Sequence, residues 1–314
     1  MDVRTIGRSA LRTPRLVLGG NVFGWTATGA EAVAILDRFA EAGGMMIDTA
    51  DVYSAWVPGH KGGESESLIG EWLKRRGKRD DVLIATKVGM LPWGDARKLE
   101  PAHIAHAAEE SLRRLGTHID LYYAHQDDAE TPLAETLGAF DLLVTAGKVR
   151  AIGASNYSAE RLNEALDISE REGIARYEVL QNEYNLMTRG KFEGALQQLC
   201  LARNVGSLPF YGLASGFLTG KYRSGADKVK SIRGGRMDAY LNERGFRVLD
   251  ALEEVAGETG ATKAQVALAW IAAQPGITAP IASATSRKQL DELLGVLTLE
   301  LTGEQVERLT AAGA

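Results

Sequence analysis

Short apolar runs alternate with helix-like segments along most of this 314-residue chain. Each run is bounded by Gly, Pro or polar residues, as buried strands are, and the segments between them repeat apolar residues with the spacing of amphipathic helices. The predicted strands cover residues 15–18, 45–48, 82–86, 119–124, 149–154, 177–181, 205–211 and 277–282. The predicted helices cover residues 29–42, 64–75, 101–115, 131–146, 158–172, 190–202, 243–257, 263–273 and 286–297.

This alternation favours an α/β fold, a (β/α)8 TIM barrel, because parallel strands are joined by helical crossovers. No linker-like change in composition interrupts it, so we expect one domain over residues 1–314. Residues 3–13 predict an N-terminal β-hairpin, and the Gly-, Lys- and Arg-rich stretch 222–242 predicts extra loops at the barrel mouth. A doubly wound sheet is the alternative, but the loop at 19–24 lacks the G-x-G-x-x-G spacing typical of that fold.

The composition excludes several classes of function. A net charge of -5 and a pI near 5.7 give no reason to expect nucleic acid or a membrane surface as a partner. The one cysteine, Cys200, suits a reducing compartment, and the start of the chain lacks the apolar core of a signal peptide, so we expect a cytoplasmic protein. His103 and His106 lack an evident third ligand, so no metal site is expected.

Ionisable residues stand at the ends of three consecutive predicted strands. These residues are Asp48, Lys87 and His125, and Tyr53 follows in the loop after Asp48. Because the carboxyl ends of barrel strands converge on one face, we expect the four side chains to meet there. Taken alone, each has an ordinary explanation, such as a salt bridge at the barrel mouth or an aromatic residue packed in a loop. Their convergence favours a catalytic site.

The four residues together have the chemistry of proton transfer. A free tyrosine has a pKa near ~10, too high for an efficient proton donor at neutral pH. We expect the Lys87 cation to lower the pKa of Tyr53, and Asp48 to keep that lysine charged and oriented. His125 supplies a second donor to a developing alkoxide.

Longer motifs in the chain resemble those of the aldo-keto reductase family, in particular the bacterial branch that is also similar to potassium-channel β subunits. They cover nearly the whole chain in the expected order. The matching motifs are Asp48-Thr49-Ala50-x-x-Tyr53, Thr86-Lys87-Val88-Gly89, Asp120-Leu121-Tyr122-Tyr123-Ala124-His125, Gly147-Lys148-Val149-Arg150-Ala151-Ile152-Gly153-Ala154-Ser155-Asn156, Gln181-Asn182-Glu183-Tyr184-Asn185 and Leu218-Thr219-Gly220-Lys221-Tyr222.

The resemblance implies an oxidoreductase that transfers a hydride between NADP(H) and a carbonyl or alcohol. Tyr53 would be the general acid/base, Lys87 and Asp48 its tuning pair, and His125 the group that orients the carbonyl. Two rivals remain open. One is a regulatory, cofactor-binding subunit with slow turnover, and the other is a barrel lyase or isomerase that uses Lys87 to form an imine. The substrate, the direction of reaction and the oligomeric state are not specified by the sequence.

The resemblance also implies positions for the cofactor. Ser155, Asn156 and Gln181 would hold the nicotinamide amide, and an aromatic at the end of the seventh strand, Phe210 with Tyr211 beside it, would stack on its ring. Family members commonly have Tyr-Ser-Pro-Leu at this point, where this chain has Phe210-Tyr211-Gly212-Leu213. The implied cofactor residues are Asn21, Ser155, Asn156, Gln181, Phe210, Tyr211, Leu213, Ser215, Lys221, Ser283, Thr285, Arg287, Gln289 and Glu292.

Hydroxyl groups beside a basic residue make residues 283–293 a candidate 2′-phosphate site, at the expected start of a helix. This pattern favours NADPH/NADP+, with Ser283, Thr285 and Arg287 contacting the phosphate, although an ordinary helix cap explains the same hydroxyls and NADH stays possible. Four aromatic residues in loops after early strands are candidates for the walls of a small-molecule carbonyl pocket. They are Phe23, Trp25, Trp56 and Trp93.

Overall fold

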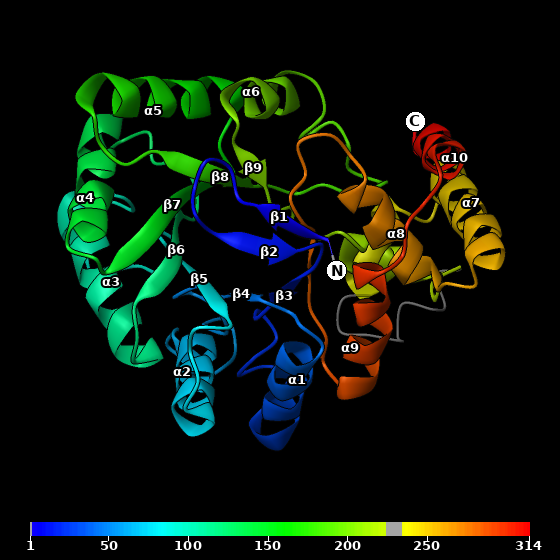
Figure 1. The fold of residues 1–314 in the computed structure, drawn as a ribbon, viewed down its shortest axis with the longest axis horizontal. Coiled ribbons are helices and arrows are strands. Elements are labelled where there is room, and N and C mark those ends of the chain that lie inside the picture. The colour runs from blue at the N-terminus through cyan, green and yellow to red at the C-terminus, as the bar shows by residue number, and fades with distance from the viewer. Residues whose placement is uncertain (1, 224–233) are drawn as a thin grey trace.

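The computed structural model describes residues 2–223 and 234–314, and its centre is a sheet of eight parallel strands (Figure 1). Their spatial order is β10-β3-β4-β5-β6-β7-β8-β9. A parallel bridge between Ser207 and Ile277 joins the two ends of the sheet, and the Thr278 N–H donates to the Ser207 carbonyl at 2.8 Å. The sheet therefore curls into a barrel, which confirms the predicted (β/α)8 fold. The barrel strands are β3 (Val17–Gly19), β4 (Met46–Asp48), β5 (Leu83–Val88), β6 (Ile119–Ala124), β7 (Val149–Ser155), β8 (Tyr177–Gln181), β9 (Gly206–Ser207) and β10 (Ile281–Ala282).

Helices surround the barrel, as the apolar spacing predicts (Figure 1). Within the described residues they are α1 (Gly29–Glu41), α2 (Glu64–Arg76), α3 (Pro101–Leu115), α4 (Leu133–Thr145), α5 (Ala159–Glu172), α6 (Ala195–Arg203), α7 (Glu243–Thr259), α8 (Lys263–Ala272), α9 (Arg287–Leu294) and α10 (Gly303–Ala312), with short 3-10 helices η1 (Ala214–Thr219), η3 (Gly234–Ala239) and η4 (Gly295–Leu297). Helices α7 and α10 pack together at one side of the ring. None of the described helices is both long and apolar enough to cross a membrane.

The structure corrects several predicted boundaries. The last two strands are shorter than expected because Pro209 and Pro280 carry no N–H for the ladder. Helix α6 begins later than residue 190, since Gly194 has a left-handed φ of 95°. Helix α10 is missing from the prediction, although the capping box of Thr302 and Gln305 marks its start. Within the predicted irregular stretch 222–242, residues 224–233 lie outside the described residues.

The N-terminal hairpin, β1 (Val3–Thr5) with β2 (Arg12–Pro14), crosses the barrel axis (Figure 1). Its residues Ile6 and Leu11 are buried in one cluster with barrel-lining side chains such as Met46 and Leu83, so they close the amino-terminal end of the barrel. Gly7 is required at the turn. It has a φ of 55°, and a Cβ there would lie 2.0 Å from a backbone oxygen of β8. The opposite end of the barrel is left for a site.

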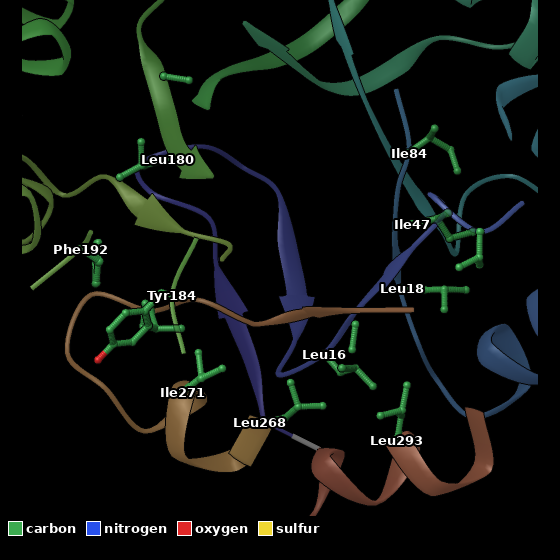
Figure 2. Packing of buried hydrophobic residues seen from close by; sticks show 14 of the residues in the cluster. Leu16, Leu18, Ile47, Ile84, Leu180, Tyr184, Phe192, Leu268, Ile271 and Leu293 are labelled. Carbon is green, nitrogen blue, oxygen red and sulfur yellow. The ribbon is translucent and has the colours of Figure 1, made fainter. Parts of the chain in front are cut away.

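Alternating side chains along each strand divide the apolar core into two parts. Leu18, Ile47 and Ile84 belong to the outer cluster, which also contains helix residues such as Leu268 and Leu293 (Figure 2). Their strand neighbours belong to a separate cluster inside the barrel. Because the side-chain period of a strand is two, each strand that lines the barrel also determines which residue points inward at its carboxyl end.

Candidate active site

A polar layer lies at the carboxyl ends of the strands, above the apolar interior of the barrel. On β5, Leu83 and Ala85 belong to the interior cluster, and Lys87, two residues further, therefore points inward as well. Asp48 follows Met46 in the same way on β4, and both polar side chains are buried. Strand pairing thus brings together residues that are far apart in the sequence.

The Lys87 ammonium is the centre of the layer. Its Nζ donates to Asp48 Oδ2 at 2.7 Å, to the Thr49 carbonyl at 2.7 Å and to the Tyr53 hydroxyl at 2.9 Å. An ammonium has three N–H donors, so these three acceptors satisfy it completely. The lysine residue is 0% exposed, which makes the ion pair with Asp48 fully desolvated on the lysine side. The contact to Tyr53 OH puts the phenol in direct reach of a positive charge.

The prediction that the pKa of Tyr53 is lowered is wrong for this structure. Burial, followed by the negative charge of Asp48, raises the pKa of Tyr53 well above its ordinary value. Burial also lowers the pKa of Lys87, against the opposing charge of Asp48. Asp48 receives Tyr53 OH only at 3.4 Å, whereas Lys87 donates at 2.9 Å. The phenol is therefore kept protonated, which is the form that a general acid requires.

His125 lies beside the tyrosine with its imidazole neutral. Burial, with a smaller effect of the Lys87 charge, holds the pKa of His125 well below 6.5. The ring centroids of Tyr53 and His125 are 6.0 Å apart. The buried His125 Nδ1 has no hydrogen-bond partner among the described residues. A neutral imidazole next to a protonated phenol supplies a second group for a substrate oxygen.

Three further polar side chains extend the layer along β7 and β8. Gln181 Nε2 donates to Asp48 Oδ1 at 2.8 Å, so Gln181 orients the aspartate, a contact that the sequence does not indicate. Asn156 Nδ2 donates to the His125 carbonyl at 3.1 Å and to Ser155 Oγ at 3.0 Å. Asn156 also has a φ of 58°, an uncommon conformation that asparagine tolerates. These contacts leave the Asn156 Oδ1 acceptor and the Ser155 hydroxyl hydrogen for an amide.

A left-handed segment after β9 forms the next part of the site. Ala214, Ser215 and Gly216 have φ values of 47°, 58° and 100°. Consecutive left-handed residues that are not all glycine are strained, and such strain concentrates at ligand clamps. A Cβ added to Gly216 would lie 3.5 Å from Lys221 Nζ, so a basic group stands beside this backbone. The segment begins after Leu213, which is partly buried.

Phe210 and Tyr211 precede this segment, and their ring centroids are 5.0 Å apart. The Phe210 N–H extends the strand pairing by donating to the Asn182 carbonyl at 2.9 Å. Tyr211 has a φ of 55°, is 38% exposed and acts electrostatically on Tyr53. Both rings therefore stand at the mouth of the barrel.

The predicted adenosine region gathers around the start of α9. Ser283 Oγ donates to Asn21 Oδ1 at 2.5 Å, which links β10 to the loop after β3. Gln289 Oε1 accepts from both the N–H and the hydroxyl of Thr285 at 2.9 Å. Ser286 is the helix cap. The side chain of Glu292 has no role visible in these contacts; it lies exposed on α9.

Glu31 is a residue of this region that the sequence does not reveal. Its carboxylate accepts the backbone N–H of Arg287 at 2.8 Å, so an acidic group from α1 lies against the start of α9. The Arg287 side chain is exposed and available to solvent. A negative group beside a candidate phosphate site opposes phosphate binding, and Arg287 favours it.

The four candidate substrate aromatics do not form one wall. Trp25 and Trp56 meet edge to face at 5.7 Å between ring centroids, and Trp56 lies 6.2 Å from the Tyr53 ring. The prediction that Phe23 lines the pocket is wrong, because this residue is 0% exposed and packs in the core between strands and helices. Trp93 stacks instead on His106 of α3, with ring centroids 4.3 Å apart. The described residues contain no group of three side chains that could hold a metal ion.

Comparison with known proteins identifies the class that this barrel and its polar layer define. The Aldo/keto reductase family model matches residues 15–314, and the chain belongs to this family. It is 33% identical to a probable voltage-gated potassium channel subunit beta of Oryza sativa subsp. japonica, over 99% of this chain and 96% of that protein. It is 34% identical to the uncharacterized oxidoreductase YrpG of Bacillus subtilis (98% and 95% covered), and 30% identical to the aldo-keto reductase yakc of Schizosaccharomyces pombe (89% and 81% covered), whose name includes NADP(+).

Proposed function

We propose that this chain is an NADP(H)-dependent oxidoreductase that reduces aldehydes or ketones, or oxidises the matching alcohols, with Tyr53 as general acid/base. The observation that carries the proposal is the Lys87 ammonium shared by Asp48, the Thr49 carbonyl and Tyr53. The family and its oxidoreductase-named relatives support carbonyl chemistry. We propose the whole chain as one catalytic domain in the cytoplasm, acting on a small molecule.

Proton transfer at the Tyr53 hydroxyl follows from these contacts. When a carbonyl oxygen gains negative charge, the protonated phenol donates its proton, and the tyrosinate left behind lies 2.9 Å from the Lys87 ammonium. Asp48 holds that ammonium in place, and Gln181 holds Asp48. In the reverse direction the same tyrosinate accepts the proton of an alcohol. The neutral imidazole of His125 orients the oxygen and does not compete as proton source.

The residues at the barrel mouth fit a nicotinamide dinucleotide. A bound dinucleotide would supply the hydride. Ser155, the side-chain Oδ1 of Asn156 and Gln181 would bind its amide, and Phe210 or Tyr211 would face its ring. The left-handed backbone 214–216, with the preceding Leu213 and with Lys221, would bind its phosphates. The strained, non-glycine conformation of that backbone supports such a role, because strain of this kind concentrates at ligand clamps.

The choice of NADPH over NADH depends on Arg287 at the start of α9. Arg287 is exposed, whereas the hydroxyls of Ser283 and Thr285 already donate to Asn21 and Gln289, so a phosphate has to replace those acceptors. The relative whose name includes NADP(+) supports this choice. Glu31, which binds the backbone of Arg287, is expected to limit the preference.

The test of the proposed function is Tyr53→Phe, which removes the hydroxyl and keeps the ring. We expect turnover of an aldehyde series to fall by roughly 10²–10⁴-fold, the usual contribution of general acid catalysis, while cofactor affinity is retained. Tyr184→Phe is the matched control, because that hydroxyl donates to Glu193 away from the site and its loss leaves turnover unchanged. Full turnover by folded Tyr53→Phe would refute the mechanism.

A regulatory cofactor-binding subunit is the second candidate, favoured by the similarity to channel β subunits. Single-turnover oxidation of bound NADPH by varied aldehydes separates the two functions. Rapid oxidation supports the enzyme, and oxidation far slower than cofactor exchange supports the sensor. An imine-forming role for Lys87 is disfavoured by its complete burial and by its three hydrogen bonds.

A further inference from the structure

Asp51 is a buried carboxyl group that the proposed mechanism does not use. It lies between Asp48 and Tyr53 in the loop that carries the tyrosine, and the residue is 1% exposed. Its backbone is well fixed, since its N–H donates to the Lys87 carbonyl at 3.3 Å and its carbonyl accepts the Gly63 N–H at 2.6 Å. Neither carboxyl oxygen makes a well-formed hydrogen bond among the described residues, and the nearby Val52 N–H, which lowers the pKa of Asp51, is outweighed by burial. A carboxylate in this situation would be costly.

The charged groups around Asp51 come from each element packed against it. They are Glu66 on α2, Arg114 on α3 and Lys87 on β5, and the Tyr122 hydroxyl on β6 also interacts with it. That hydroxyl is buried and likewise has no partner among the described residues. Two polar groups without partners thus share one region between the barrel and its helices.

Both cations that face Asp51 are already paired with another carboxylate. Arg114 Nε donates to Glu66 Oε2 at 2.6 Å, and the Lys87 Nζ donates to Asp48 Oδ2 at 2.7 Å. Glu66 has a second donor, the Thr86 hydroxyl, at 2.5 Å. The buried Lys87 and the partly buried Arg114 balance the two buried carboxylates of Asp48 and Glu66, and an ionised Asp51 would add an unmatched charge.

We propose that Asp51 is held as a neutral carboxylic acid, and that its neutrality keeps the Lys87 ammonium committed to Asp48 and Tyr53. Burial, and next the charge of Glu66, raise the pKa of Asp51 well above its ordinary value, in agreement with the charge balance. An ionised Asp51 would be a further anion near Lys87, beside Asp48 and Glu66, and would disfavour the tyrosinate. Asp51 is therefore a positioning residue, and its effect on turnover rests on the proposed function.

The protonation state is tested by infrared spectroscopy of the full chain. A neutral carboxylic acid has a carbonyl band well separated from that of a carboxylate. We expect Asp51→Asn to remove one such band from the neutral-pH spectrum of the wild type. The matched control is Asp128→Asn, because Asp128 is also buried but its pKa is lowered by the Leu99 N–H and the Thr131 hydroxyl. Asp128→Asn should therefore remove no neutral-acid carbonyl band. Loss of no band in Asp51→Asn overturns the proposal.

The pH dependence of stability is a second measurement. A raised folded-state pKa means that the folded protein holds a proton that the unfolded chain has lost above its own pKa near ~3.9. Between the unfolded-state pKa and the folded-state pKa, the folding equilibrium constant of wild type then falls about tenfold per pH unit relative to that of Asp51→Asn. The advantage of Asp51→Asn should thus grow as the pH rises. A constant difference overturns the proposal.

Turnover gives the positioning readout, through its pH profile. Because Asp51→Asn cannot ionise, we expect its kcat/KM for aldehydes, relative to that of wild type, to rise with pH as Asp51 ionises in wild type, and parallel pH profiles overturn the positioning role. A tenfold loss in a folded variant would show that neutrality is not the relevant property. Asp51→Leu, which is neutral and similar in size, covers the case in which Asn does not fold, and failure of both to fold refutes the proposal. If no aldehyde is reduced by wild type, the proposed function fails, while the infrared and pH measurements still decide the protonation state.

Discussion

Removing the charge of Lys87 tests the part of the site on which the proposed chemistry depends. Lys87→Met keeps the length of the apolar stem and deletes the ammonium, so Asp48 is left as a buried carboxylate whose remaining side-chain donors are Gln181 and, at 3.4 Å, the Tyr53 hydroxyl. Breaking a buried ion pair from one side costs about 3–5 kcal/mol. For a chain of this size that loss lowers Tm by roughly 5–8 °C. Turnover should fall at least as far as in Tyr53→Phe.

The double variant Lys87→Met with Asp48→Asn separates loss of the pair from loss of packing. It contains no unmatched buried charge, so its cost should be smaller than the sum of the two single variants by about 2–3 kcal/mol. Differential scanning calorimetry on the four proteins gives this coupling. Lys148→Met is the control, because its pair with Glu109 is solvent-exposed and contributes below about 1 kcal/mol. Single costs that simply add would refute the desolvated, coupled pair described here.

Two further predictions concern the ends of the site. Arg287→Ala should lower the preference for NADPH over NADH by roughly 10- to 150-fold, through loss of a charge-assisted bond of ~1.5–3 kcal/mol. Glu31→Gln should raise NADPH affinity a few-fold. Titrations of both variants with both cofactors measure these changes, and equal binding of NADPH and NADH by wild type contradicts the prediction. His125→Gln, which keeps a donor, should retain more kcat/KM than His125→Ala across para-substituted benzaldehydes, with the smallest loss for electron-poor ones; an equal loss across the series would make His125 a packing residue. Because the pKa of His125 is well below 6.5, its protonation should reduce wild-type activity only at pH values well below 6.5.

The sequence by itself determined the barrel and the four residues at its centre. The barrel strands are buried on both faces and therefore appear as continuous apolar runs. The helices bury one face and therefore repeat apolar residues about every 3.6 positions, so both patterns can be recognised in the sequence. Parallel strands also share one carboxyl edge, which is why Asp48, Lys87 and His125 were expected together. The short β9 and β10 were less predictable, because Pro209 and Pro280 interrupt the N–H ladder while the apolar pattern continues, and pairing beyond Pro209 resumes only as an isolated bridge at Phe210.

Only the tertiary structure decided which hydrogen-bond and packing partners each side chain has in distant segments of the chain. Gln181 bonds to Asp48, Glu31 to the backbone of Arg287, and Phe23 packs in the core instead of lining a pocket. Those outcomes depend on distances of a few ångströms and on desolvation, for which local periodicity carries no signal. The pKa of Tyr53 is the clearest case. The expected contact with Lys87 predicted a lowered pKa for Tyr53. Burial, which cannot be obtained from the sequence alone, raises that pKa instead.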